Sequence, residues 1–133
     1  MNTNANSILI VNGETSADMR DLLKVETEDP RAADAVALFC YQIKKTIGAY
    51  AAASGGLDTL FFAGGIGEKA PVVRARICTS LGFLGIELDA SRNEQNADVI
   101  STDAGRVKVR VIRTNEELVI ARSVCRVPDI SIT

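Results

Sequence analysis

Three glycines within four residues follow an apolar stretch in the segment "FFAGGIGEKAP", residues 61–71. Glycine weakens a packed element unless the backbone turns sharply there or something approaches it closely. A strand, a glycine turn and a helix in succession point backbone N–H groups at an anion, and the helix N-terminus adds positive potential. The spacing is neither G-x-G-x-x-G nor the P-loop pattern. A tight turn and a phosphate-binding loop are both open interpretations, and because Glu68 would repel phosphate the second needs a cation or Lys69 nearby.

A second candidate is the acidic segment "RTNEELVIAR", residues 113–122. Thr114 and Glu117 have the spacing of a capping box, in which the Glu side chain is engaged at the helix start. Glu116 then projects from the first turn without a capping role. It is either an exposed acid that the helix dipole favours or a carboxylate that holds Mg²⁺ directly or through water.

A third candidate is "SADMRD", residues 16–21, at the start of a predicted helix. Asp18 and Arg20 are either surface charges or groups that flank a ligand. If they flank a ligand, Met19 would pack against the flat apolar base of that ligand, because its side chain adapts to irregular apolar surfaces. The local spacing does not decide between the two interpretations.

The elements that must position these residues follow from hydrophobic periodicity and turn residues. The sequence predicts about four strands, at 7–11, 57–63, 83–89 and 106–114, and helices at 16–25, 30–54, 71–81 and 114–124. Helix 30–54 is the clearest, since Pro30 suits a helix start and Gly55-Gly56 a helix end. Strands that alternate with helices indicate the α/β class, although four strands are few for a sheet covered on both faces.

Composition excludes several classes of protein. The chain has 133 residues, 47% of them hydrophobic and 24% charged, which suits one domain with its own core. The net charge is −2 without a basic block, so we expect no nucleic-acid binding. No apolar run reaches the length of a membrane span, and the start lacks the pattern of a signal peptide. We therefore expect a cytoplasmic protein.

Cysteine and histidine limit the chemistry further. Cys40, Cys78 and Cys125 are odd in number and far apart, and the chain has no histidine. They are predicted to be reduced core thiols and not zinc ligands. Imidazole cannot serve as acid, base or electrophile in this chain.

Four segments together resemble the acetate kinase family, in the same order along the chain: "GETSADMRDLL", "FFAGGIGEKAPVVR", "LGFLGIELD" and "IRTNEELVIAR". These enzymes move a phosphoryl group between ATP and acetate, and propionate and butyrate kinases are close relatives. The resemblance covers about residues 13–122, and this part of the chain is similar to the C-terminal part of such a kinase. It implies a partial actin-like/ribonuclease H-like ATPase domain of the sugar kinase, Hsp70 and actin superfamily.

The resemblance also implies roles for matching residues. Asp18, Met19 and Arg20 would lie beside the adenosine, and Glu116 would be the magnesium-associated glutamate. The loop around the nucleotide and its phosphates would consist of Gly65, Ile66, Gly67, Glu68 and Lys69. The usual family residue at position 69 is asparagine, so Lys69 is a departure that adds positive charge. ATP or ADP with Mg²⁺ is thus the expected ligand.

The family's acetate-site and catalytic residues have no match in these four segments, and this also bears on function. The family's acetate-site arginines, catalytic aspartate and histidine come from regions that precede these motifs. We expect acetate, or another short carboxylate, to bind only if a missing domain is supplied, and the chain alone to be inactive. The alternatives are a non-catalytic ATP/Mg-binding module and a structural or oligomerisation fragment. The family's tendency to dimerise makes a homodimer plausible.

Domain limits follow from the same comparison of motifs. Residues 1–12 are expected to form a leader and strand, 13–125 the nucleotide-binding domain and 126–133 a loose tail. Asn12 is either the end of the family's first phosphate motif, fused across a large deletion, or part of the segment before the adenosine motif. In both cases it is a poor candidate for a metal ligand.

Overall fold

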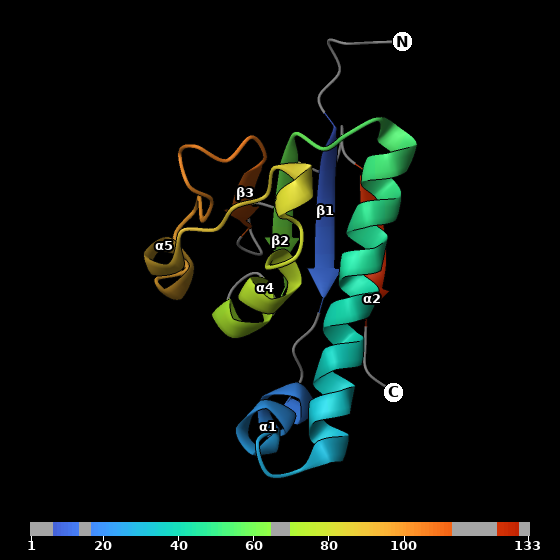
Figure 1. The fold of residues 1–133 in the computed structure, drawn as a ribbon, viewed down its shortest axis with the longest axis vertical. Coiled ribbons are helices and arrows are strands. Elements are labelled where there is room, and N and C mark those ends of the chain that lie inside the picture. The colour runs from blue at the N-terminus through green and yellow to red at the C-terminus, as the bar shows by residue number, and fades with distance from the viewer. Residues whose placement is uncertain (1–6, 14–16, 65–69, 113–124, 131–133) are drawn as a thin grey trace.

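The computed structural model describes residues 7–13, 17–64, 70–112 and 125–130, with the backbone alone at 12–13, 17–20 and 125–130. Strands alternate with helices in the described chain, which confirms the predicted α/β class (Figure 1). The elements are β1 Ile8–Gly13, α1 Ala17–Val25, α2 Pro30–Ser54, β2 Thr59–Ala63, α4 Pro71–Cys78, a 3₁₀ helix Gly82–Leu84, α5 Ala90–Glu94, β3 Lys108–Val111 and β4 Cys125–Ile130.

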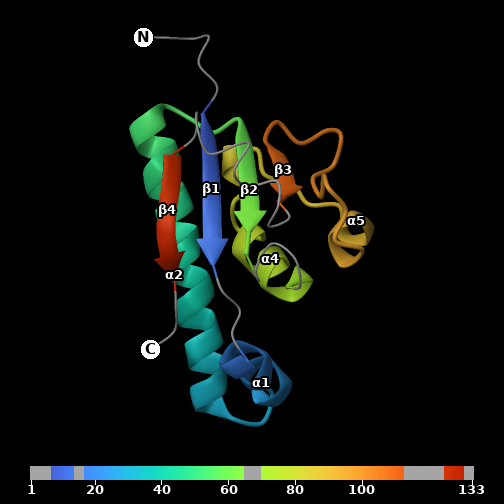
Figure 2. The same cartoon turned by 180° about the vertical axis from the view of Figure 1, so that it is seen from behind.

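The four described strands form one parallel sheet in the order β3-β2-β1-β4. Figure 2 shows the four arrows pointing the same way, toward the end of the molecule where α1 lies. Asn12 of β1 pairs with Ala63 of β2, and Phe62 of β2 pairs with Val111 of β3. The carboxyl ends of β1, β2 and β3 are therefore level with one another at one edge of the sheet.

The long helix α2 has the predicted bounds and recognisable end signals. The Asp29 side chain caps its start by accepting a hydrogen bond from the Arg31 N–H at 3.0 Å, and Pro30 occupies the first turn. Gly55 ends the helix with φ +77°, a conformation that glycine adopts without strain. Its buried residues recur every three to four positions: Ala32, Val36, Phe39, Cys40, Ile43, Ile47 and Ala51.

Both faces of the sheet are buried, which explains the continuous apolar runs of its strands. Helices α2 and α4 cover one face (Figure 1), where Leu9, Leu60 and Val109 join the main core. A second cluster lies on the opposite face and consists of alternate strand residues and the residue just after β3: Ile10, Phe61, Ala63 and Ile112. In the part of the chain that the structure describes, no helix lies over this second face (Figure 2).

The segment 82–97 differs from the sequence prediction. A strand was predicted at 83–89, but the chain forms the 3₁₀ helix Gly82–Leu84, and Leu88 makes only an isolated antiparallel bridge with Ser101. The backbone turns at Gly85, where φ is +94°, and this interrupts any extended run. The polar residues that follow, predicted as a connection, include α5, which Asp89 caps through the Arg92 N–H.

The expected loose tail at 126–133 is wrong for most of its length. Cys125–Ile130 forms β4 and pairs in parallel with β1, with an irregularity between Val11 and Gly13. Strand β4 contains Pro128 and lies at an edge of the described sheet, where proline is tolerated. The predicted helix 114–124 lies outside the described residues.

Candidate functional site: the carboxyl edge of the sheet

The predicted site segments all follow strands that end at one edge of the sheet. Helix α1 begins at Ala17, four residues beyond the end of β1, and Figure 1 shows it beyond the carboxyl end of that strand. The glycine segment follows the end of β2 at Ala63, and the acidic segment begins two residues after β3 ends at Val111. In open α/β sheets, ligands bind at the carboxyl ends of the strands. The topology thus places side by side the ends of the three strands that precede these segments, although the strands are far apart in the sequence.

Only some of the predicted site residues at this edge are among the described residues. Asp18, Met19 and Arg20 lie in the first turn of α1, where the structure describes the backbone alone. The predicted loop Gly65–Lys69 and Glu116 lie outside the described residues. Gly64 is described, and it turns away from β2 with φ +72°, a conformation that side chains beyond glycine disfavour. The backbone conformation at position 64 therefore favours glycine over any other residue.

An ion pair connects the two helices that border the edge. Glu26, one residue beyond α1, accepts a hydrogen bond from Arg76 Nη1 of α4 at 2.8 Å, and Arg76 Nη2 contacts its other oxygen. The hydrogen bond with Arg76 lowers the pKa of Glu26 and raises that of Arg76. Leu22 and Leu23 of α1 also pack against the main core. The C-terminal end of α1 is therefore held relative to α4.

Sequence reasoning missed Arg74, which is fully buried in α4. Its Nε donates to Asn93 Oδ1 at 2.8 Å, and its Nη2 donates to the Asn93 carbonyl at 2.9 Å. Burial lowers the pKa of Arg74 to about 10, and the charges of Cys78 and Glu94 oppose that change. The apolar spacing of Val72, Val73 and Ile77 carried no signal for a buried arginine between them.

The described thiols are unsuited to nucleophilic chemistry. Cys40 and Cys78 are buried and free, as predicted, and burial raises the pKa of both, that of Cys78 to about 12. Thiolate is the reactive form of cysteine, so both side chains stay unreactive near neutral pH. The Cys125 side chain lies outside the described atoms. Among the described residues, no cluster of three or more Cys, Asp or Glu side chains could hold a metal.

A cavity of about 430 Å³ lies between α4 and α5, apart from the predicted site residues. Its lining includes Cys78, Thr79, Ile86, Glu87 and Glu94. Two of the polar groups at this cavity are already engaged: Thr79 Oγ1 donates to the Ala75 carbonyl, and Glu87 accepts from Thr102. The cavity carries no predicted nucleotide contact.

Comparison with known proteins agrees with this arrangement. The family model described as "Acetokinase family" matches residues 2–122. The chain belongs to the acetokinase family. It is 48% identical over 125 residues to a propionate kinase from Citrobacter rodentium, which is 93% of this chain and 31% of that protein. It is 48% identical over 117 residues to an acetate kinase from Bacteroides fragilis, 86% of this chain and 29% of that protein.

Solved structures of acetokinase relatives share the fold. The crystal structure of Porphyromonas gingivalis acetate kinase superposes with a TM-score of 0.69 at 41% identity, over 80% of this chain and 28% of that one. A propionate kinase from Francisella tularensis gives a TM-score of 0.67 at 33% identity, over 79% of this chain and 27% of that one. The chain thus has part of the actin-like ATPase fold and spans about a third of the length of these relatives. None of its described helices is long and apolar enough to cross a bilayer.

Proposed function

We propose that this chain is the nucleotide-binding part of an acetate-kinase-type phosphotransferase. The reaction transfers the γ-phosphoryl group of ATP to a carboxylate oxygen of acetate and yields acetyl phosphate and ADP. The observation that carries the proposal is the common position of three family motifs after the carboxyl ends of β1, β2 and β3, which are adjacent parallel strands. The acetokinase match over residues 2–122 supports it independently.

Each motif has a role in this proposal. Asp18, Met19 and Arg20, in the first turn of α1, lie beside the adenosine. The loop Gly65–Lys69 surrounds the nucleotide phosphates, with glycines that leave the backbone N–H groups accessible and Lys69 as a compensating cation. Glu116 holds Mg²⁺, directly or through water, as Mg²⁺ prefers one or two carboxylates and retains several waters. Such an ion would neutralise phosphate charge, and the chain's own loop would position the phosphates.

The acyl acceptor is the less defined part of the proposal. The relatives include both acetate and propionate kinases, and the chain spans about 31% of one propionate kinase and 29% of one acetate kinase. We propose a short carboxylate as acceptor, bound by residues that a further domain supplies. The cytoplasm as location and a homodimer as assembly belong to the same proposal.

Two alternatives involve no phosphoryl transfer. A non-catalytic module would bind ATP and Mg²⁺ without any response to acetate. A structural or oligomerisation fragment would use exposed apolar side chains instead. Leu38 and Tyr41 favour this second alternative, since they are 56% and 55% exposed one turn apart on α2. A mass that rises with concentration in light scattering would support it, and a monomer at high concentration would oppose it.

Calorimetric titration with ATP and Mg²⁺ tests the nucleotide site. The wild type should bind saturably, and Gly67→Val should abolish binding, because a branched side chain blocks the approach of phosphate to the backbone. Gly48→Val is the matched control: Gly48 lies within α2, and a Cβ there meets no heavy atom within 4 Å. Absence of binding by a folded wild type, or equal binding by Gly67→Val, would contradict the proposal.

A further inference from the structure

Arg74 and Asn93 form a buried polar pair at the start of α4. Arg74 is fully buried and Asn93 is 3% exposed. Arg74 Nε donates to Asn93 Oδ1 at 2.8 Å, and Nη2 donates both to the Asn93 carbonyl at 2.9 Å and to Asn96 Oδ1 at 2.5 Å. Burying a guanidinium is costly, so an apolar side chain would serve simple core packing better. The pair therefore calls for a reason beyond filling space.

Asn93 engages the first turn of α4 at two points. Its Oδ1 accepts from Arg74, and its Nδ2 donates to the Pro71 carbonyl at 2.8 Å. Only an amide side chain can accept and donate in this way, because an ionised carboxylate has no donor. Asn96, which also accepts from Arg74, has φ +52°, so the turn after α5 adopts an uncommon conformation at this contact. These hydrogen bonds fix the position of the first turn of α4 relative to α5.

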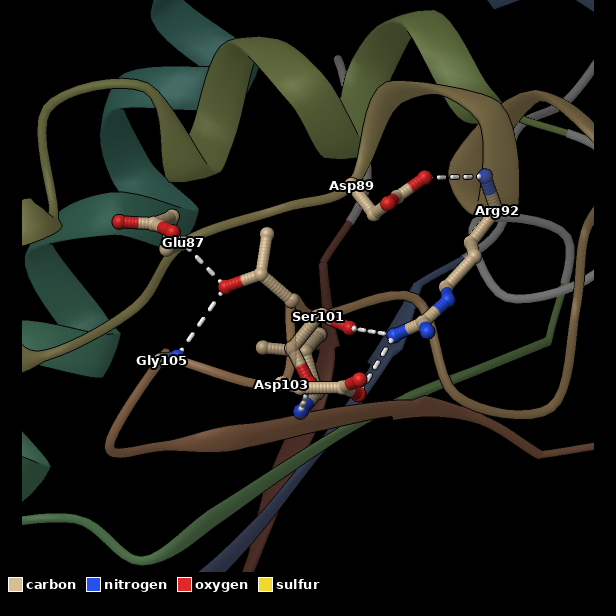
Figure 3. Close-up of polar contacts among 8 residues, drawn as sticks. Glu87, Asp89, Arg92, Ser101, Asp103 and Gly105 are labelled. Atoms are coloured by element: carbon tan, nitrogen blue, oxygen red, sulfur yellow. Dashed lines mark hydrogen bonds and ion pairs between the residues drawn. The ribbon is translucent and has the colours of Figure 1, made fainter.

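Helix α5, which carries Asn93, is itself tied to the segment that leads into β3. Figure 3 shows the Arg92 side chain reaching from α5 to Ser101 and Asp103. Arg92 Nη1 donates to the Ser101 carbonyl at 2.6 Å and to Asp103 Oδ1 at 3.2 Å, while Asp89 caps the helix. Because these contacts hold α5 in place, Asn93 has a fixed position. Its hydrogen bonds to Arg74 and Pro71 therefore hold the first turn of α4 in place as well.

The start of α4 matters because of what precedes it. Ala70 is buried, provides no side-chain cap and leads directly into Pro71. The predicted nucleotide segment ends one residue earlier, at Lys69. We propose that Arg74 and Asn93 are positioning residues for nucleotide binding, which fix the first turn of α4 and with it the exit of the glycine segment. This inference rests on the proposed function.

The test compares three single-residue variants with the wild type. Asn93→Asp keeps the size and the acceptor for Arg74 but removes the donor to Pro71. Arg74→Lys keeps the charge but loses the planar set of donors, and it gives the same test if Asn93→Asp does not fold. Tyr50→Phe is the control, because it removes one hydrogen bond, from the Tyr50 hydroxyl to the Ile8 carbonyl, at the opposite end of β1.

Two readouts separate positioning from general stability. By calorimetry well below the melting temperature, ADP–Mg²⁺ should bind Asn93→Asp or Arg74→Lys about tenfold more weakly than the wild type, because binding must then reorder the first turn of α4 at about the free-energy cost of one buried hydrogen bond. Tyr50→Phe should keep the wild-type affinity. Hydrogen exchange at amides 74 and 75, the first that the helix itself bonds, should be faster in the two pair variants and unchanged in the control.

The outcomes distinguish this inference from the proposed function. A wild type that binds ADP–Mg²⁺, with a folded Asn93→Asp variant of equal affinity, would overturn the positioning role alone. Unchanged exchange at amides 74 and 75 in both pair variants would overturn it as well, whether or not nucleotide binds. A folded wild type that binds no nucleotide would count against the proposed function, and that result needs no variant.

Discussion

Gly85 determines the path of the chain after α4 at the level of a single residue. It ends the 3₁₀ helix with φ +94°, and its N–H donates to the Gly82 carbonyl at 2.9 Å. The Arg106 side chain crosses directly over it and hydrogen-bonds to the carbonyls of Leu57 and Leu84. A Cβ at position 85 would lie 2.9 Å from the Arg106 Cβ. Backbone conformation and close contact both require glycine here.

We expect Gly85→Ala to lower the free energy of unfolding by about 2 to 3 kcal/mol, through positive φ and steric overlap together. Urea denaturation measures the change. Gly82→Ala is the matched control in the same 3₁₀ helix, since a Cβ there meets no heavy atom within 4 Å. It should change stability by less than about 0.5 kcal/mol. Equal effects of the two substitutions would show that the conformation at Gly85 is not as described.

The burial of individual residues can be predicted from the sequence where a pattern repeats. The alternation of Val107, Val109 and Val111 indicated one buried face of a strand, and all three are buried. Arg74 could not be predicted, because arginine is almost never fully buried and its acceptors lie about twenty residues away. The roles of Asp18, Lys69 and the other site residues remain predictions that rest on family resemblance.

The ion pair between Glu26 and Arg76 acts at the level of elements, because it joins the end of α1 to α4. The Glu26 carboxylate is 15% exposed and the Arg76 guanidinium 41% exposed. A partly exposed pair contributes little stability, and salt screens it. Its value is geometric, since it holds together the two helices that border the proposed nucleotide site.

We expect Glu26→Gln to destabilise the protein by about 0.5 kcal/mol at pH 7. The pKa of Glu26 is lowered below 4.5 in the folded state, so its contribution is present above pH 4.5 and disappears as the pH falls through the lowered pKa. The difference between wild type and variant should therefore vanish in acid. Urea denaturation across this range checks it, with Glu28→Gln as control for a nearby exposed carboxylate. A difference that persists in acid would contradict the pairing.

Most elements could be predicted from the sequence, and the exceptions have physical causes. Pro30 and Gly55-Gly56 marked α2 correctly because end signals are local. Strand β4 was missed because its partner β1 lies more than a hundred residues away in the sequence. The strand predicted at 83–89 failed because the backbone turns at Gly85, where φ is +94°, after the 3₁₀ helix Gly82–Leu84.

The whole molecule presents one half of a phosphoryl-transfer site in our account. It contains no histidine and spans about a third of the length of its acetokinase relatives. We expect no acetate-dependent ADP formation by the chain alone at ordinary kinase rates of about 1 s⁻¹ or more. A coupled assay with ATP, Mg²⁺ and acetate measures it, with a full-length acetate kinase as positive control. Turnover at such rates would mean that the chain supplies the acceptor site itself.

The most direct test of the central claim is to map ADP–Mg²⁺ onto the isotopically labelled chain by NMR, for which 14.2 kDa is a favourable mass. With nucleotide at this edge, chemical-shift changes should concentrate at the carboxyl ends of β1, β2 and β3 and in the segments that follow them, 13–20, 64–71 and 112–117. Gly48 and the rest of α2 should be unaffected. Changes confined to the cavity between α4 and α5, or no changes at all in a folded chain, would contradict a nucleotide site at this edge.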